Sequence, residues 1–255
     1  MKLVGSGAAG YLIHRLTEGT FGMQRIEAEE MLDQEGWSPA EVSCALSAIR
    51  TVNRLYGGDR THKLLFQKVM RRFPGQPLHI LEVASGRGEV LQAAVRQLQV
   101  GGTAVSVTLL DQHASHLPGP GDWPAPLPQP AVLAGDALAL PLPDAGVDVV
   151  SCCLFLHHLG PEAMRRFLRE ALRVARVAVL VNDVERSSLH YTLARLQSLV
   201  DPSPLSQHDG PTSVRQAYTL GELRAAAGEL GHAYDLQRYW LCRMGLVLWK
   251  RPLAQ

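Results

Sequence analysis

The chain lacks a surplus of charge of either sign. Its 255 residues include 25 Lys and Arg against 24 Asp and Glu, which leaves a formal net charge of +1. Such a balance creates no whole-molecule field that would attract nucleic acid or an anionic membrane. A basic stripe with interleaved aromatic residues is missing as well. We therefore expect no nucleic-acid partner.

Long apolar runs are also missing. No stretch is long enough to span a bilayer, so we expect no stable insertion into a membrane. The opening segment, MKLVGSGAAGYLIH, faintly imitates a signal peptide, but glycines interrupt its apolar part and it soon meets His14 and Arg15. We therefore reject a signal peptide and predict a cytoplasmic protein.

Cysteine is scarce, and its arrangement shows no metal-binding spacing. The four cysteines are Cys44, Cys152, Cys153 and Cys242. Two of them are adjacent inside an apolar run, which favours buried thiols in a reducing compartment.

The hydrophobic pattern changes near residue 77. Before that point the chain reads as helical and carries no strand pattern. After it, short apolar strands alternate with amphipathic helices, which is typical of a parallel sheet covered on both faces. We therefore predict an N-terminal helical cap or lid over 1–76 and an α/β domain over 77–255.

Three helices are expected in the cap. Ser38, Pro39 and Glu41 give the second of them a cap, a favourable first residue and a capping box. A helix over 24–36 precedes it, and one over 61–73 follows it.

Seven strands are expected in the second domain, the last two as an antiparallel pair. In chain order they cover 78–83, 104–111, 131–136, 147–153, 177–183, 234–243 and 245–251. The connection over 117–130 is rich in proline, which excludes an ordinary helix and predicts an extended surface segment.

The first strand leads into a glycine-rich turn, LEVASGRGE. Its backbone can approach a ligand closely, and the following helix start offers free N–H groups. A dinucleotide fingerprint would need a third glycine, but Leu91 stands there. Glu82 ends the strand with a charge that would repel a pyrophosphate and that suits an amino-bearing ligand. The turn therefore favours S-adenosylmethionine over a dinucleotide.

Acidic residues follow three successive strands. Glu82 ends the first strand, Asp111 ends the second, and Asp136 follows the third. The carboxyl ends of parallel strands meet at one edge, where doubly wound sheets bind ligands. Asp111 can accept hydrogen bonds from both hydroxyls of a ribose, and Asp136 from an adenine amino group.

At these residues the chain resembles the class I S-adenosylmethionine-dependent methyltransferases, over roughly residues 78–183. Ala84 stands where the first glycine of the family's motif is usual. The resemblance implies a Rossmann-like, seven-stranded sheet of order 3-2-1-4-5-7-6. The cofactor-binding residues that it implies are Glu82, Ala84, Ser85, Gly86 and Gly88 for the methionine part, Asp111 and Gln112 for the ribose, Asp136 and Ala137 for the adenine, and Cys153 and Leu154 below the sulfonium.

Two further segments narrow the class of molecule that could accept the methyl group. TVNRLYGGDRTHKLL is similar to a segment of quinone-biosynthesis methyltransferases, with Asn53, Gly58 and His62 as rough matches. VNDVERSSLHYTLARL and HDGPTSVRQAYTLGEL resemble methyltransferases encoded near type III polyketide synthases, whose products are phenolic lipids. Both resemblances imply a flat aromatic or polyketide-like acceptor. Further candidates for acceptor binding are Asn182, Arg186, Tyr191, Arg215 and Tyr218.

Methyl transfer to a phenol would benefit from a general base, and histidine titrates in a suitable range. His157 and His158 follow the fourth strand, while His190 and His208 come after the fifth. We expect the base among these four. His190 and Tyr191 are expected on a helix over the acceptor, and His208 in an active-site loop.

A metal-assisted mechanism of the kind found in catechol methyltransferases would need an acid at the end of the fourth strand. The chain has SCCLFLHH there, although Asn182 and Asp183 end the fifth strand. Because magnesium prefers oxygen ligands, we expect no metal. Asn182 and Asp183 are instead expected to orient the acceptor or to cap the next helix.

The sequence therefore predicts an enzyme that moves a methyl group from S-adenosyl-L-methionine to a small aromatic acceptor and releases S-adenosyl-L-homocysteine. The acceptor is phenolic, quinol or polyketide-like, and in-line displacement at oxygen is the leading reaction. Carbon methylation of a quinol ring is a close variant. A non-catalytic partner subunit on the same fold is the alternative class. A monomer and a homodimer both stay open.

Overall fold

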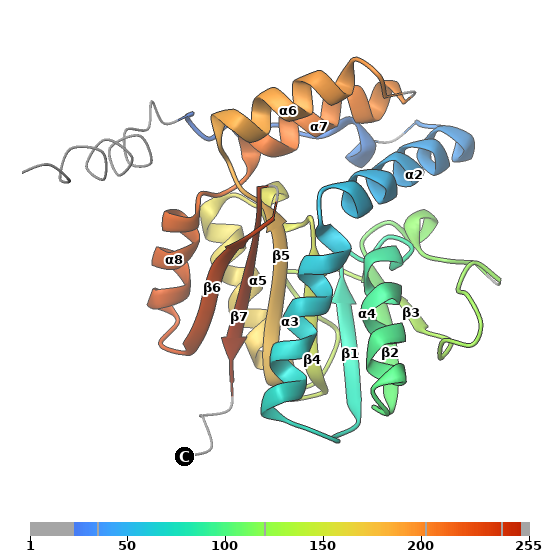
Figure 1. Cartoon of the computed structure of the whole chain (residues 1–255), viewed down its shortest axis with the longest axis vertical. Helices are drawn as coiled ribbons and strands as arrows, with labels where there is room; N and C mark the ends of the chain where they lie inside the picture. The colour runs from blue at the N-terminus through green and yellow to red at the C-terminus, as the bar shows by residue number, and fades with distance from the viewer. Residues whose placement is uncertain (1–22, 35, 120, 202, 241, 251–255) are drawn as a thin grey trace, which may run out of the picture.

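The polypeptide folds around a mixed β-sheet with helices on both faces (Figure 1). The computed structural model describes residues 23–34, 36–119, 121–201, 203–240 and 242–250. Within these ranges seven strands follow the order β3-β2-β1-β4-β5-β7-β6, which confirms the predicted class I methyltransferase sheet. β7 runs antiparallel to β5 and β6, and the other neighbouring strands are parallel.

The elements alternate along the chain as the hydrophobic pattern indicated. The strands are β1 (Leu78–Val83), β2 (Val105–Asp111), β3 (Ala131–Ala134), β4 (Val147–Cys153), β5 (Ala175–Val184), β6 (Ala233–Tyr239) and β7 (Arg243–Trp249). The α-helices are α2 (Pro39–Leu55), α3 (Gly58–Arg72), α4 (Glu89–Val100), α5 (Pro161–Val174), α6 (Ser188–Ser198), α7 (Pro204–Gln216) and α8 (Leu220–Glu229). The short 3-10 helices are η1 (Met31–Asp33), η2 (Ala114–His116) and η3 (Leu156–His158). Among the described helices, none combines the length and the apolarity that a membrane crossing requires.

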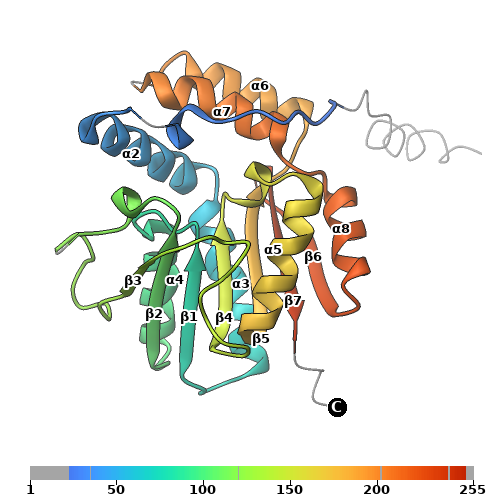
Figure 2. The same ribbon diagram turned by 180° about the vertical axis from the view of Figure 1, so that it is seen from behind.

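Two apolar layers enclose the sheet. α3 and α4 cover one face (Figure 1), and α5 and α8 cover the other (Figure 2). β1, β4 and β5 are buried along almost their whole length, which is why they read as near-continuous apolar runs in the sequence.

A cap lies above the carboxyl edge of the sheet. α2, α6 and α7 form its helices, with α6 packed along α7 (Figures 1 and 2). Residues 23–33, called the strap below, run beside α7. The backbone N–H groups of Met31 and Leu32 donate to the two carboxylate oxygens of Asp209, at 2.8 and 3.0 Å. A carboxylate on α7 therefore holds the end of the strap.

The third helix predicted for the cap lies on the sheet instead. α3 packs against α4, β5 and β7, and its Leu65, Phe66 and Val69 are buried in that layer. A boundary at residue 76 would therefore divide the layer that covers the sheet. Residues 1–22, which include the segment compared with a signal peptide, lie outside the described residues.

Two local predictions are wrong. Within the segment expected as a helix over 24–36, residues 24–30 are not helical, and the described residues form only the short 3-10 helix η1. The loop expected around His208 is the helix α7, with Pro211 inside it. The capping box of α2 is confirmed, because Ser38 and Glu41 exchange the two predicted hydrogen bonds.

The proline-rich connection between β2 and β3 is anchored in the core. Trp123 and Leu127 are 3% and 4% exposed and join the layer beside α4. A Cβ atom on Gly88, at the start of α4, would lie 2.7 Å from the ring of Trp123. This close approach explains why position 88 has no side chain.

Candidate active site

A large cavity opens at the carboxyl edge of the sheet, below the cap. Its volume is about 980 Å³, and its walls come from β1, β2, β4, α2, α6 and α7. That volume lies at the upper end of the range typical of small-molecule sites, so it has room for a cofactor and an acceptor together.

Every residue predicted to bind the cofactor lines this cavity, at the end formed by β1, β2 and β4. These residues are Glu82, Ala84, Ser85, Gly86, Gly88, Asp111, Gln112, Asp136, Ala137, Cys153 and Leu154. The structure thus brings together residues that are spread over more than seventy positions of the sequence. Their individual contacts with the cofactor stay predictions.

The turn after β1 has a left-handed backbone. Ala84, Gly86 and Gly88 have φ angles of 51°, 48° and 67°. A Cβ atom on Gly86 would meet no atom within 4 Å, so the turn leaves open space beside it for a ligand. The left-handed conformation costs an L-residue roughly 1–2 kcal/mol. Ala84 therefore keeps the shape of the turn at a modest cost in stability.

Asp111 and Asp136 are fixed by backbone donors. Asp111 accepts hydrogen bonds from the N–H groups of Gly86 and His113, at 2.8 and 3.0 Å. Asp136 accepts one from Leu138 at 2.8 Å. Each carboxylate keeps further lone pairs, so both can accept hydrogen bonds from a bound ribose or adenine.

His157 is a buried histidine between two carboxylates. Its Nδ1 lies 2.8 Å from Asp183 Oδ1, and its Nε2 lies 3.5 Å from Glu30 Oε1. Burial alone would lower the pKa of His157, but the two carboxylates outweigh burial and raise it to about 10. The ring is therefore protonated near neutral pH, and a protonated ring has no lone pair with which to act as a base.

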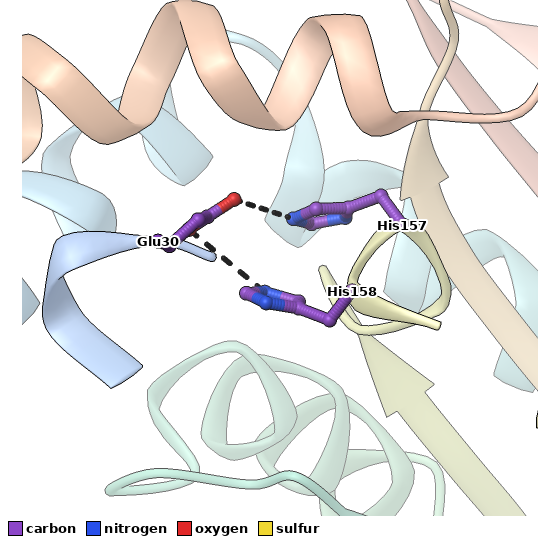
Figure 3. A group of neighbouring side chains, drawn as sticks. All are labelled: Glu30, His157 and His158. Carbon is purple, nitrogen blue, oxygen red and sulfur yellow. Dashed lines mark ion pairs between the residues drawn. The ribbon is translucent and has the colours of Figure 1, made fainter. Parts of the chain in front are cut away.

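His158 lies beside His157 and is also paired with carboxylates. Figure 3 shows the two rings next to each other and the carboxylate of Glu30 beside them, with an ion pair to each ring. His158 Nδ1 is 2.9 Å from Asp33 Oδ2, and its Nε2 is 3.9 Å from Glu30 Oε2. All four of these residues line the cavity.

His190 is a neutral histidine of the site. It projects from α6, is 7% exposed and lines the cavity. Burial lowers its pKa to about 4. Its Nδ1 lies 3.1 Å from the carbonyl oxygen of Glu185, and because a carbonyl only accepts, Nδ1 carries the proton. The lone pair is therefore on Nε2.

Arg243 places a positive charge in the wall close to His190. It is the first residue of β7, is 1% exposed and lines the cavity. Its Nη2 donates to Asn53 Oδ1 at 2.7 Å, and its Nη1 has no hydrogen-bond partner in the described part of the chain. Because Nη1 is itself buried, the guanidinium would favour a negatively charged ligand oxygen through its charge rather than by direct contact.

Seven residues proposed from the sequence do not line the cavity. They are His62, Asn182, Arg186, Tyr191, His208, Arg215 and Tyr218. His62 is buried beside Glu82, with 3.5 Å between Nε2 and Oε2. The buried amide of Asn182 donates to the Gly58 carbonyl at 2.9 Å, so it joins β5 to the start of α3.

Arg186 and Tyr218 have partners within the protein. The guanidinium of Arg186 donates to the carbonyls of Met23 and Ala217 and to the carboxylate of Glu222. The hydroxyl of Tyr218 donates to the Leu159 carbonyl at 2.6 Å. Both side chains therefore hold the cap and the loops around it.

His208 and Arg215 are exposed side chains of α7, and His208 pairs with Asp209 at 2.9 Å. Tyr191 is half-buried on α6. Assigning His208 to an active-site loop failed because α7 turns this residue away from the cavity.

Three cavity residues were missed by sequence reasoning. Glu30 and Asp33 belong to the segment that was expected as a helix, and no local pattern links them to His157 and His158, more than 120 positions later. Arg243 carried a signal, because it is a single charge next to the apolar run MGLVLW.

Comparisons with known proteins agree with this geometry. A family profile described as a methyltransferase domain matches residues 81–179. A comparison with curated protein sequences gave no match. The solved structures that are similar to the chain include a SAM-dependent methyltransferase from Aquifex aeolicus, with 17% identity, a TM-score of 0.56, and coverage of 85% of this chain and 100% of that one.

Two further structures share the fold. An O-methyltransferase family 2 protein from Planctomyces limnophilus, solved in complex with apigenin, is 14% identical, with a TM-score of 0.53 and coverage of 86% of this chain and 63% of that one. Magnesium protoporphyrin IX methyltransferase from Synechocystis, solved with bound SAH, is 11% identical, with a TM-score of 0.50 and coverage of 95% and 94%.

The order of the strands is that of the class I methyltransferase fold, and the cavity lies at the carboxyl edge of the parallel strands. Residues 81–179 match the profile of a methyltransferase domain, and the chain shares its fold with S-adenosylmethionine-dependent methyltransferases.

Proposed function

We propose that the chain transfers a methyl group to an oxygen of a small aromatic acceptor, such as a phenol, a quinol or a polyketide-like compound. The observation that carries this proposal is the continuity of the cavity, because the cofactor end and a chamber below the cap belong to one space. S-adenosylmethionine supplies a methyl group on a positively charged sulfur. The protein has to hold the acceptor oxygen in line with that methyl group.

The chamber suits an aromatic ring. Its wall includes Leu46 and Ile49 from α2, Val184 from β5 and Val214 from α7. An apolar wall with a few placed polar groups is typical of small-molecule sites. The polar groups at this end include the side chains of His190, Asn53 and Arg243, which could orient a hydroxyl.

His190 is the residue that we assign as the general base. Its Nε2 holds a lone pair at neutral pH, whereas His157 is protonated and His208 lies outside the cavity. A phenol has a pKa near 10, so a base with a pKa of about 4 takes the proton only as the oxygen–carbon bond forms. Arg243 favours the developing negative charge on that oxygen.

The O-methyltransferase that shares this fold was solved with apigenin, which supports an aromatic acceptor for this chain as well. The polyketide-like acceptor rests on the sequence resemblance.

The proposal is tested in two steps. Calorimetric titration with S-adenosylmethionine, S-adenosylhomocysteine and NAD should show binding of the two adenosyl ligands and none of NAD. Transfer of labelled methyl from the cofactor is then measured on a panel of phenols and quinols, with aliphatic alcohols as the control acceptors. We expect labelled methyl ethers of the aromatic compounds and none from the alcohols.

Each of the other possible outcomes would support a different function for the chain. A product methylated on a ring carbon would replace oxygen transfer with carbon transfer. Tight adenosyl binding with no turnover on any acceptor would favour a non-catalytic partner subunit. Binding of NAD alone would overturn the assignment of the glycine-rich turn.

A further inference from the structure

Three side chains at the edge of the cavity converge as metal ligands do. The ligand atoms of Glu30, His157 and His158 all lie within 4.8 Å of one another. The two imidazoles lie side by side, and their Nε2 atoms are 3.5 and 3.9 Å from the carboxylate oxygens of Glu30 (Figure 3). Around a tetrahedral zinc with bonds of about 2.0–2.2 Å, ligand atoms are roughly 3.3–3.6 Å apart. The group is therefore close to a coordinating arrangement already.

Each of these side chains is oriented by a second group. Asp183 holds His157 Nδ1 at 2.8 Å, and Asp33 holds His158 Nδ1 at 2.9 Å. A carboxylate on Nδ1 leaves Nε2 as the coordinating atom, and such pairs recur behind metal-bound histidines.

The carboxylate of Glu30 is supported in the same way. Its Oε1 accepts hydrogen bonds from the Ser213 hydroxyl at 2.6 Å and from the Gln216 amide at 3.2 Å. Both donors come from α7, so the strap and the cap fix the third ligand.

The local charges call for a cation. The carboxylates of Glu30, Asp33 and Asp183 contact two imidazoles, and Glu30 and Asp183 are almost fully buried. Buried carboxylates need compensation by positive charge. In the metal-free chain a proton on His157 supplies part of this charge, and one divalent ion would replace that proton, with the two imidazoles then neutral.

The types of ligand atom favour zinc over magnesium. Two imidazoles and one carboxylate are the three protein ligands of one type of zinc site, in which the fourth position stays open. Magnesium would favour an all-oxygen set, and methyl transfer from a sulfonium involves no change of redox state. All three ligands line the cavity, so the open position would face it.

We propose that Glu30, His157 and His158 bind one zinc ion, that Asp183 and Asp33 orient the two imidazoles, and that the open position faces the acceptor chamber. A water or an acceptor oxygen would occupy that position. Metal binding is independent of the acceptor class, so it can fail or succeed whatever the acceptor is.

The full chain, treated with a chelator and dialysed, is titrated with Co²⁺ and then with Zn²⁺. One Co²⁺ per chain should bind and show the visible absorption of a four- or five-coordinate ion, and one Zn²⁺ should displace it. His158→Ala, which changes the most exposed of the three ligands, should abolish stoichiometric binding. Asp33→Asn should weaken it by about 10- to 100-fold.

His208→Ala is the matched control, because His208 also pairs with an aspartate but lies outside the cavity. It should bind Co²⁺ like the unaltered chain. Calorimetric binding of S-adenosylhomocysteine by every variant shows that each is folded. It also separates a failure of the metal site from a failure of the methyltransferase assignment.

Two results would overturn the proposal. One is a folded chain that binds S-adenosylhomocysteine but neither ion, in which case protonated imidazoles compensate the carboxylates. The other is metal binding that His158→Ala and Asp33→Asn leave unchanged, which would place the ion elsewhere on the chain.

Discussion

The surroundings of His190 determine both the position of its proton and the charge of its ring. The Glu185 carbonyl fixes the proton on Nδ1, and burial keeps the ring uncharged. Lowering the pKa to about 4 reduces the basicity of Nε2, but it also guarantees a lone pair at every pH where the protein would work. The nearby charge of Arg243 acts in the same direction on the ring.

Replacing His190 should therefore lower turnover and leave cofactor binding intact. His190→Asn should reduce kcat by about 10²- to 10⁴-fold, the usual contribution of a general base. For the unaltered chain, kcat/KM should be level between pH 6 and 8 and fall only as the pH approaches about 4, where His190 becomes protonated. Both quantities come from the labelled-methyl assay.

Tyr191→Phe on the same helix is the control, since Tyr191 does not line the cavity, and its turnover should be unchanged. A rate that climbed steadily from pH 7 to 10 would contradict the assignment. It would instead point to a base of much higher pKa, such as His157.

The strap is the element that sequence reasoning misjudged, and its contacts explain the error. The Ile26 N–H donates to the Arg215 carbonyl at 3.2 Å, and the Ala28 N–H donates to the Gln216 side chain at 3.2 Å. A backbone that bonds to a distant helix cannot also bond to itself as a helix. These tertiary contacts override the local propensity of the segment.

The helix α7 was missed because it contains residues that usually interrupt a helix. Gly210 and Pro211 suggested a loop, but the helix continues through them. Its start could have been predicted, because Ser203 and Pro204 repeat the signal that correctly located α2. The central strands β1, β4 and β5 were predictable, since a buried parallel strand leaves a continuous apolar run.

Releasing the strap from α7 should loosen the cap without affecting the cofactor end. Asp209→Asn removes a charged acceptor that binds two backbone N–H groups, which should cost about 1.5–3 kcal/mol per bond that is lost. Hydrogen exchange over 23–33 should quicken, and turnover should fall while S-adenosylhomocysteine affinity stays the same.

Thr212→Ala suits as the control for this change, because among the described residues the Thr212 hydroxyl bonds only within α7, to the His208 carbonyl. Its exchange rates over the strap should match those of the unaltered chain. Equal exchange in Asp209→Asn would show that the carboxylate does not hold the strap.

At the scale of the whole molecule, the two ends of the site differ in how far the sequence predicts them. The cofactor end lies where parallel strands finish, so its acids were found from the order of strands and turns alone. The acceptor end draws on Glu30, His190 and Arg243, which come from the strap, from α6 and from β7. No local sequence pattern predicts that these segments meet, because the packing of the cap over the sheet brings them together.

Because the cofactor end is built from several strands, its occupation should stabilise the entire fold. A ligand at one hundred times its Kd adds about 2.7 kcal/mol to the free energy of unfolding, and about 2–4 °C of Tm accompanies each kcal/mol in a chain of this size. S-adenosylhomocysteine should therefore raise Tm by about 5–11 °C in a thermal melt.

Asp111→Ala should shrink this shift relative to its own ligand-free Tm, because the ribose loses its acceptor. Glu162→Gln, on the exposed start of α5, should keep the full shift. An undiminished shift in Asp111→Ala would remove Asp111 from the cofactor site.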